Sequence, residues 1–85
     1  MKSRSITVND TPTALARGGA ATVPKSVAVQ NNSQSTTLYV GGPDVSVANG
    51  FRVAGGGVFS VDLMGDDLYG IVDTGTLDVI VLERG

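Results

Sequence analysis

The chain has 85 residues, contains neither cysteine nor histidine, and carries six basic against eight acidic side chains, for a net charge of −2. This composition excludes disulfides, thiolate zinc sites and every mechanism that uses histidine as a general acid or base. A chain of this length buries only about 60–65% of the surface that its unfolded form exposes. We therefore expect marginal stability for the isolated chain and stabilisation by association with other subunits.

The charges are distributed unevenly along the chain. Residues 1–42 have a net charge of +3 and residues 43–85 a net charge of −5. Such asymmetry is typical either of a basic segment that docks on an acidic surface or of charges scattered over a solvated surface. Separated basic residues and four aromatic rings supply neither a phosphate-neutralising stripe nor a stacking platform, so we expect no nucleic-acid binding. We find no signal-peptide pattern and no apolar run of about 18 residues, and we expect a protein that is made in a cytoplasm without membrane insertion.

The first 25 residues are rich in Gly, Pro, Thr and Ala and poor in large apolar side chains. The segment "SITVN" (5–9) alternates like a half-buried strand. In "TPTALARGGAAT" (11–22), a proline and a glycine pair leave room for only one helical turn, which predicts an extended arm or an irregular loop. We expect residues 1–25 to form a loose N-terminal arm and residues 26–85 to form one β-domain. The arm offers three basic candidates for contact with a partner protein, namely Arg4, Arg17 and Lys25.

Residues 26–85 alternate β-rich segments with turn residues. The last expected strand has apolar residues on both faces, which favours a central position in a sheet or cover by a neighbouring subunit. About seven or eight short strands at this spacing predict an all-β fold, a small antiparallel sandwich or barrel, with jelly-roll-like and immunoglobulin-like strand orders both open. The clearest expected strands are 26–31, 36–41, 58–64, 67–73 and 76–83.

The segment "GGPDVSVANGF" (41–51) contains two turn signals. Pro43 presets φ at the second position of a turn that begins at Gly42. The pair Asn49-Gly50 predicts a type I′ turn, because both central positions of that turn need positive φ. A phosphate-binding loop would need a Lys-Ser/Thr pair and a following helix, and neither is present. We expect a small protruding hairpin that offers Phe51 and Arg52 to a neighbouring protein.

The chain has few side chains that could perform catalysis. Asp66 and Asp67 are adjacent, so on a strand they would point to opposite faces, and in a turn they would make local hydrogen bonds. The loop carboxylates do not have the spacing of an EF-hand. The two lysines both lie in the loose first segment, where a rigid Ser-Lys site is not expected. We therefore predict no enzymatic activity, no cofactor and no metal site.

Several motifs of residues 27–85 form a recognisable pattern: Val29-x-Asn31, Tyr39 to Val45, Asn49-Gly50, Gly57, "DLYGI" (67–71) and Gly75-Thr76 through Leu82-Glu83. In these motifs the chain resembles a group of small tailed-bacteriophage virion proteins, described as head decoration, head fibre or minor capsid proteins. Two departures from the family pattern occur: Gly70 stands where alanine is expected, and "AGGG" (54–57) replaces a single glycine.

The resemblance implies a non-enzymatic β-rich protein that binds the exterior of an icosahedral capsid and decorates or cements the shell. Its partners would then be the major capsid protein and further copies of itself, with a trimer favoured, and its location the capsid surface of the virion. Two alternatives remain open from the sequence. The chain could be a receptor- or carbohydrate-binding module of a phage fibre or tail, or a β-sandwich with another binding role.

Overall fold

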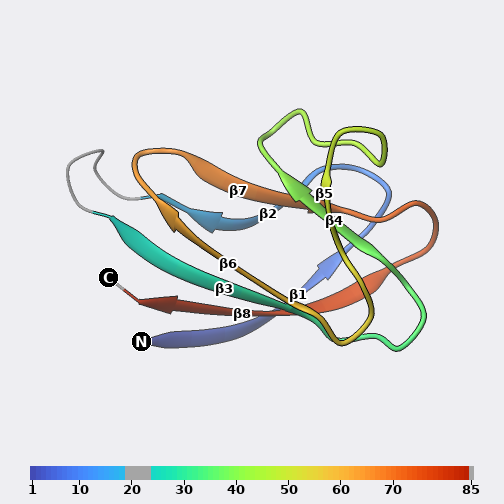
Figure 1. Ribbon diagram of the computed structural model, residues 1–85, viewed down its shortest axis with the longest axis horizontal. Helices are drawn as coiled ribbons and strands as arrows, with labels where there is room; N and C mark the ends of the chain where they lie inside the picture. The colour runs from blue at the N-terminus through green and yellow to red at the C-terminus, as the bar shows by residue number, and fades with distance from the viewer. Residues whose placement is uncertain (19–23, 85) are drawn as a thin grey trace.

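The computed structural model describes residues 1–18 and 24–84, and within them all regular secondary structure is β-strand (Figure 1). The chain forms two four-stranded antiparallel sheets, with strand orders β1-β8-β3-β6 and β2-β7-β4-β5. We call these sheets A and B. The strands are β1 (Lys2–Val8), β2 (Thr13–Arg17), β3 (Lys25–Asn31), β4 (Leu38–Gly41), β5 (Phe51–Val53), β6 (Val58–Leu63), β7 (Asp67–Ile71) and β8 (Leu77–Arg84).

The strand pairing follows one rule from one end of the chain to the other. The first strand pairs with the eighth, the second with the seventh, the third with the sixth and the fourth with the fifth. The chain is therefore one long antiparallel ribbon, rolled so that successive ribbon segments alternate between the two sheets. This is the eight-stranded, double Greek-key arrangement of a jelly roll. The expected all-β sandwich is confirmed, and the strand order is jelly-roll-like rather than immunoglobulin-like.

The core lies between the sheets and follows the alternation of the strands. In β8, Leu77, Val79 and Val81 are buried, whereas the residues between them are partly or fully exposed. This strand lies between β1 and β3, so the expectation of a central position is confirmed. The largest fully buried apolar side chains come from both sheets and from the segment after β7: Val8, Leu15, Val29, Leu38, Val40, Val72, Val79 and Val81.

The described part of the expected N-terminal arm is not loose. Residues 2–8 form β1, which pairs with β8 along its whole length, and residues 13–17 form β2, which pairs with β7. Val8 and Leu15 are completely buried. The arm prediction fails here because composition reports local preference, whereas β1 is held by β8, whose paired residues are 69 to 81 positions away in the sequence. Residues 19–23 of the expected arm lie outside the described residues.

The connection between β4 and β5 is the tip of the rolled ribbon. The amide of Val45 donates to the carbonyl of Gly42 at 3.0 Å, which confirms the turn with Pro43 at its second position. The hairpin predicted around Asn49-Gly50 is wrong. Neither residue has positive φ, and "VSVA" does not form a strand.

A single helical turn replaces the predicted type I′ turn. The side-chain oxygen of Ser46 accepts from the amide of Asn49 at 3.3 Å, while the side-chain oxygen of Asn49 accepts from the amide of Ser46 at 2.7 Å. This reciprocal pair is the arrangement of a helix capping box. The amide of Gly50 then donates to the carbonyl of Ser46 at 2.8 Å and closes the turn.

An alanine at the position of Gly70 would require two neighbouring leucine side chains to shift. A Cβ atom there would be 2.9 Å from Cδ1 of Leu15 and 3.2 Å from Cδ1 of Leu38. Both leucines are fully buried between the sheets. The glycine therefore lets two large core residues meet over β7.

Candidate binding site

The two sheets separate at one end of the sandwich and form a polar cleft. It has a volume of about 480 Å³ and lies near the first strands of both sheets. Figure 1 shows that the start of β1 and the end of β8 lie side by side at this end of the molecule, where Lys2 pairs with Glu83. The cleft is lined by Lys2, Arg4 and Ile6 of β1, residues 14–17 of β2, Lys25 of β3 and Glu83 of β8.

The cleft arises because the inward positions of the strands change from apolar to charged. In β1 the inward-facing series runs from Val8 through Ile6 to Arg4 and Lys2. In β8 the buried series that begins at Leu77 ends at Glu83. Residues of the same strand face share the same environment by geometry, so these charges lie at the end of the core and not on an outer face.

Glu83 is the only charged residue that is buried in the described part of the chain. Its carboxylate accepts two hydrogen bonds from the guanidinium of Arg4, at 3.0 and 3.1 Å. The Nζ atom of Lys25 lies 3.7 Å from the same carboxylate. Bidentate contact with arginine is the strongest common way to hold a carboxylate in place.

Arg4 also binds an irregular point in β2. The register of β2 against β7 shifts between Ala14 and Ala16, so Leu15 is the extra residue of a bulge. A bulge leaves its extra residue unpaired in the ladder. The Nη2 atom of Arg4 donates to the free carbonyl of Leu15 at 2.6 Å, and one side chain thereby connects β1, β2 and β8.

The cleft is strongly basic although the whole chain is acidic. Four of the six basic residues of the chain line it, around one internal carboxylate. Arg17 lies at its exposed side and pairs in register with Asp67, whose carboxylate accepts from the amide of Gly18 at 3.1 Å. Because Arg4 binds Glu83 with two hydrogen bonds, the cations that remain for an external anion are Lys2, Arg17 and Lys25. Of these, Lys25 also lies near Glu83 and donates to the carbonyl of Arg17.

The structure divides the five predicted contact residues into two groups. Arg4, Arg17 and Lys25 meet in the basic cleft. Phe51 and Arg52 lie on β5, the edge strand at the other side of sheet B. Phe51 is 65% exposed, and its ring lies 5.3 Å from that of Phe59 at an interplanar angle of 47°.

Sequence reasoning missed Lys2 and Glu83 as members of the cleft. The signal was present in the alternation of the last strand, where the positions of Leu77, Val79 and Val81 continue to Glu83. An acidic residue at the end of a buried series needs a basic partner. The alternation could not say that this partner is Arg4, 79 residues away in the sequence.

The loop carboxylates stay apart. Within residues 1–18 and 24–84, no group of three or more side chains is placed to hold a metal ion. Asp66 accepts a hydrogen bond from the amide of Met64 at 2.9 Å and thereby closes the turn before β7. The same residues contain no helix that is long and apolar enough to cross a membrane.

No protein-family model matches the chain, and a comparison with curated proteins finds no match either.

Proposed function

We propose that the protein is a structural component of a tailed-bacteriophage virion, a head decoration or minor capsid protein that binds the exterior of the shell. The observation that carries the proposal is the basic cleft, in which four of six basic side chains gather on an acidic molecule. Together with the family resemblance of residues 27–85, it favours a docking function over a catalytic one.

The cleft has the chemistry of a receptor for an acidic segment. Arg17 and Lys25 can each bind a carboxylate at the rim, while Glu83 neutralises Arg4 inside and keeps the interior end of the cleft folded without a ligand. On a capsid lattice, an acidic segment of the major capsid protein would be presented many times. Complementary charge raises the rate of encounter and selects the docking orientation more than it raises intrinsic affinity.

Small size also agrees with a decorating function. An isolated sandwich of 85 residues has a limited core, and any partner that binds only the folded form stabilises it by mass action. On a shell, both the major capsid protein and neighbouring copies of the chain would supply that stabilisation.

The decisive measurement is the number of copies of this chain in purified virions, relative to the major shell protein. Hundreds of copies in a simple ratio are expected for a decoration protein, whereas six to eighteen copies would place it in the tail or in fibres. Absence from purified virions would overturn the proposal.

A matched pair of variants tests whether the basic cleft is the docking surface. Arg17→Glu reverses a charge at the cleft rim and should reduce the copy number in virions at least tenfold. Arg52→Glu makes the same change on β5, far from the cleft, and should leave the copy number unchanged. The reverse pattern would assign docking to the β5 edge.

A sugar- or receptor-binding module is the second candidate, and the exposed ring of Phe51 favours it. Carbohydrate sites commonly stack a sugar on an exposed aromatic face. A glycan-array signal that disappears in Phe51→Ala, together with a low copy number, would support this alternative.

A further inference from the structure

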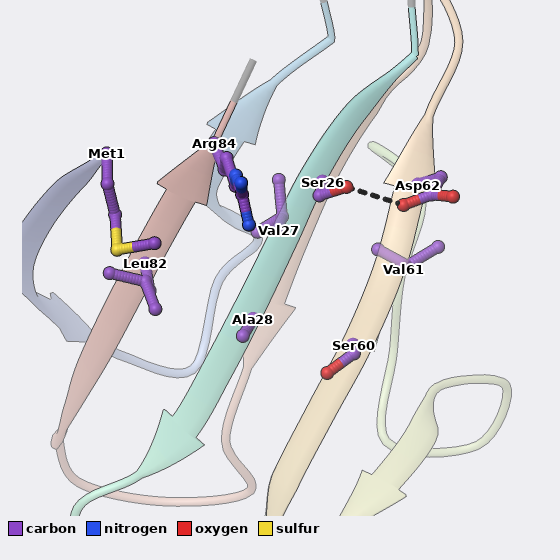
Figure 2. Close-up of a pocket in the computed structure, with 9 residues that line it drawn as sticks. All are labelled: Met1, Ser26, Val27, Ala28, Ser60, Val61, Asp62, Leu82 and Arg84. Carbon is purple, nitrogen blue, oxygen red and sulfur yellow. Dashed lines mark hydrogen bonds between the residues drawn. The ribbon is translucent and has the colours of Figure 1, made fainter.

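The outer face of sheet A has an ordered pattern that none of the preceding functions uses. Strands β8, β3 and β6 are adjacent there, and their outward residues align in three rows by the register of the sheet. The rows are Arg84-Ser26-Asp62, Leu82-Ala28-Ser60 and Ile80-Gln30-Val58. Figure 2 shows the first two rows side by side across the three strands.

The middle of this face is hollowed, and the flanking strands β8 and β6 each carry an exposed aliphatic side chain. Small side chains on β3 and β6 leave a hollow of about 320 Å³, lined among others by Ser26, Ala28 and Ser60 (Figure 2). Leu82 on one side is 38% exposed and Val58 on the other is 63% exposed. These side chains provide apolar area that a second protein surface could cover.

The charges of the first row lie at opposite sides of the same face. Arg84 and Asp62 are both in register with Ser26, so they are two strand spacings apart, or about 9.6 Å. Asp62 accepts a hydrogen bond from the hydroxyl of Ser26 at 3.0 Å. Neither charge forms an ion pair, with the other or with a third residue, within the described residues.

We propose that a second copy of this chain packs against this face about a two-fold axis that runs along β3. A half-turn about a line parallel to the strand keeps every residue at its own height and exchanges β8 with β6. Arg84 of each copy then faces Asp62 of the other, twice per dimer.

The other two rows are complementary under the same rotation. Leu82 of each copy lies over Ser60 of the other, and Ile80 of each copy faces Val58 of the other. The small residues Ser26 and Ala28 lie at the axis, where the two sheets approach most closely. One operation thus places opposite charges together in the first row, a large side chain over a small one in the second, and two aliphatic side chains together in the third, where Gln30 of both copies lies at the axis. Such self-complementary contacts are what a two-fold interface requires.

The size of the face predicts a weak dimer. The three strands β8, β3 and β6, of about seven residues each, cover roughly 14 by 23 Å, or about 320 Å² per copy, which is below the roughly 800 Å² per partner of a standard interface. Aligned sheets also pack within about 30° of each other, so the rows match best near the axis. We therefore expect a dimer that forms at high concentration and dissociates on dilution. This inference stands on the sheet geometry and is independent of the proposed virion function.

Charge exchange tests the pairing directly. Sedimentation equilibrium of the full chain, from micromolar to millimolar concentration, should show a monomer–dimer equilibrium. Arg84→Glu and Asp62→Arg should each weaken the dimer at least tenfold, because each places like charges opposite one another twice. The double variant Arg84→Glu/Asp62→Arg should restore the dissociation constant to within about threefold of the original. Arg52→Glu, with the same charge change on sheet B, should have no effect.

Cross-linking supplies a second readout that does not depend on affinity. The chain has no cysteine, so one introduced thiol gives an unambiguous product. Ala28→Cys, at the axis, should give a covalent dimer with a short bismaleimide, whereas Ser5→Cys, on the outward face of β1, should not. A chain that stays monomeric at millimolar concentration, a trimer, or a dimer that the double variant fails to restore would each overturn the proposal.

Discussion

Two polar residues are buried in the described part of this sandwich, Asn31 and Glu83, and they lie at opposite ends of it. Asn31 is at the end of β3 and pairs in register with Val79, whereas Glu83 is near the end of β8 and pairs with Val27. One is a neutral amide that is completely closed off from solvent. The other is a carboxylate at the inner wall of an open cleft.

The side-chain amide of Asn31 makes all its hydrogen bonds to backbone groups. Its amide nitrogen donates to the carbonyls of Thr36 at 2.7 Å and Val53 at 2.9 Å, and its amide oxygen accepts from the amide of Ser33 at 3.1 Å. These bonds connect the β3–β4 loop to the end of β5. Nothing remains for a ligand to bind, so the role of Asn31 is structural.

The carboxylate of Glu83 is instead bound by two long side chains, those of Arg4 and Lys25. Arg4 holds it by two hydrogen bonds, but the side chain of Arg4 is 44% exposed and that of Lys25 is 26% exposed. Water or an external carboxylate can therefore reach the cations without unfolding the sandwich. A buried polar side chain whose hydrogen-bond partners are backbone groups, such as Asn31, stabilises the fold and has no free group for a ligand. A buried polar side chain whose partners are long, exposed side chains, such as Glu83, leaves those partners able to bind a ligand.

The largest effect is expected from Asn31→Asp. The change removes both donors to Thr36 and Val53 and places an acceptor, charged at neutral pH, against two carbonyls. An uncompensated buried charge costs about 3–5 kcal/mol. Urea unfolding followed by circular dichroism should show this loss, or no cooperative transition at all.

The neighbouring residue supplies the matched control for that change. Gln30→Glu makes the same chemical change on the outer face of sheet A, and we expect its free energy of unfolding to stay within about 0.5 kcal/mol of the original. If Asn31→Asp and Gln30→Glu proved equally stable, the structural role assigned to Asn31 would be wrong.

In the cleft, we expect replacement of Arg4 to lower the free energy of unfolding more than replacement of Glu83 does. Arg4→Met leaves the carboxylate of Glu83 buried with only Lys25 at 3.7 Å, and it deprives the carbonyl of Leu15 of its donor. We expect a loss of about 2–3 kcal/mol. Glu83→Gln leaves cations that water can reach and an amide oxygen that still accepts from Arg4, so its loss should be about 1 kcal/mol.

The same urea unfolding experiment measures both variants. A larger loss for Glu83→Gln than for Arg4→Met would mean that the carboxylate, and not its exposed partner, determines the stability of this end of the sandwich. The contrast with Asn31 would then disappear.

Sequence patterns identified the parts of this fold that depend on near neighbours. The expected strand 36–41 is present as β4, in which Leu38 and Val40 are buried and alternate with the half-buried Tyr39. The turn at Pro43 follows from the fixed φ of proline. The type I′ turn predicted from Asn49-Gly50 does not form, because the reciprocal hydrogen bonds of Ser46 and Asn49 stabilise a helical turn there instead.

Long-range pairing explains the remaining failures. Composition assigns β1 to an arm because nothing near it in the sequence indicates that β8 will pair with it. The candidate site was affected in the same way. Charge asymmetry selected Arg4, Arg17 and Lys25, but the cleft exists only once the rolled ribbon brings β1, β2, β3 and β8 to one end of the molecule.

The smallest effect on stability is expected from Lys25→Met, a change that tests whether Lys25 stabilises the fold or contributes mainly to ligand binding. Lys25 is the more distant partner of Glu83 and also donates to the exposed carbonyl of Arg17 at 3.1 Å. A partly exposed pair contributes about 0–1 kcal/mol, so Lys25→Met should lower the free energy of unfolding by less than about 1 kcal/mol. The same change removes one of the cations at the cleft rim.

Binding of a labelled oligoglutamate peptide, measured by fluorescence anisotropy at low salt, should therefore weaken in Lys25→Met by about threefold, or roughly 0.65 kcal/mol. Arg52→Met removes the same charge from the outer face of sheet B and should leave binding unchanged. The difference between the two variants should shrink as salt is added, because exposed charges are screened beyond about 8 Å at physiological ionic strength. Equal binding by both variants would show that the peptide responds to net charge alone, and the exposed partners of Glu83 would then have no special capacity for a ligand.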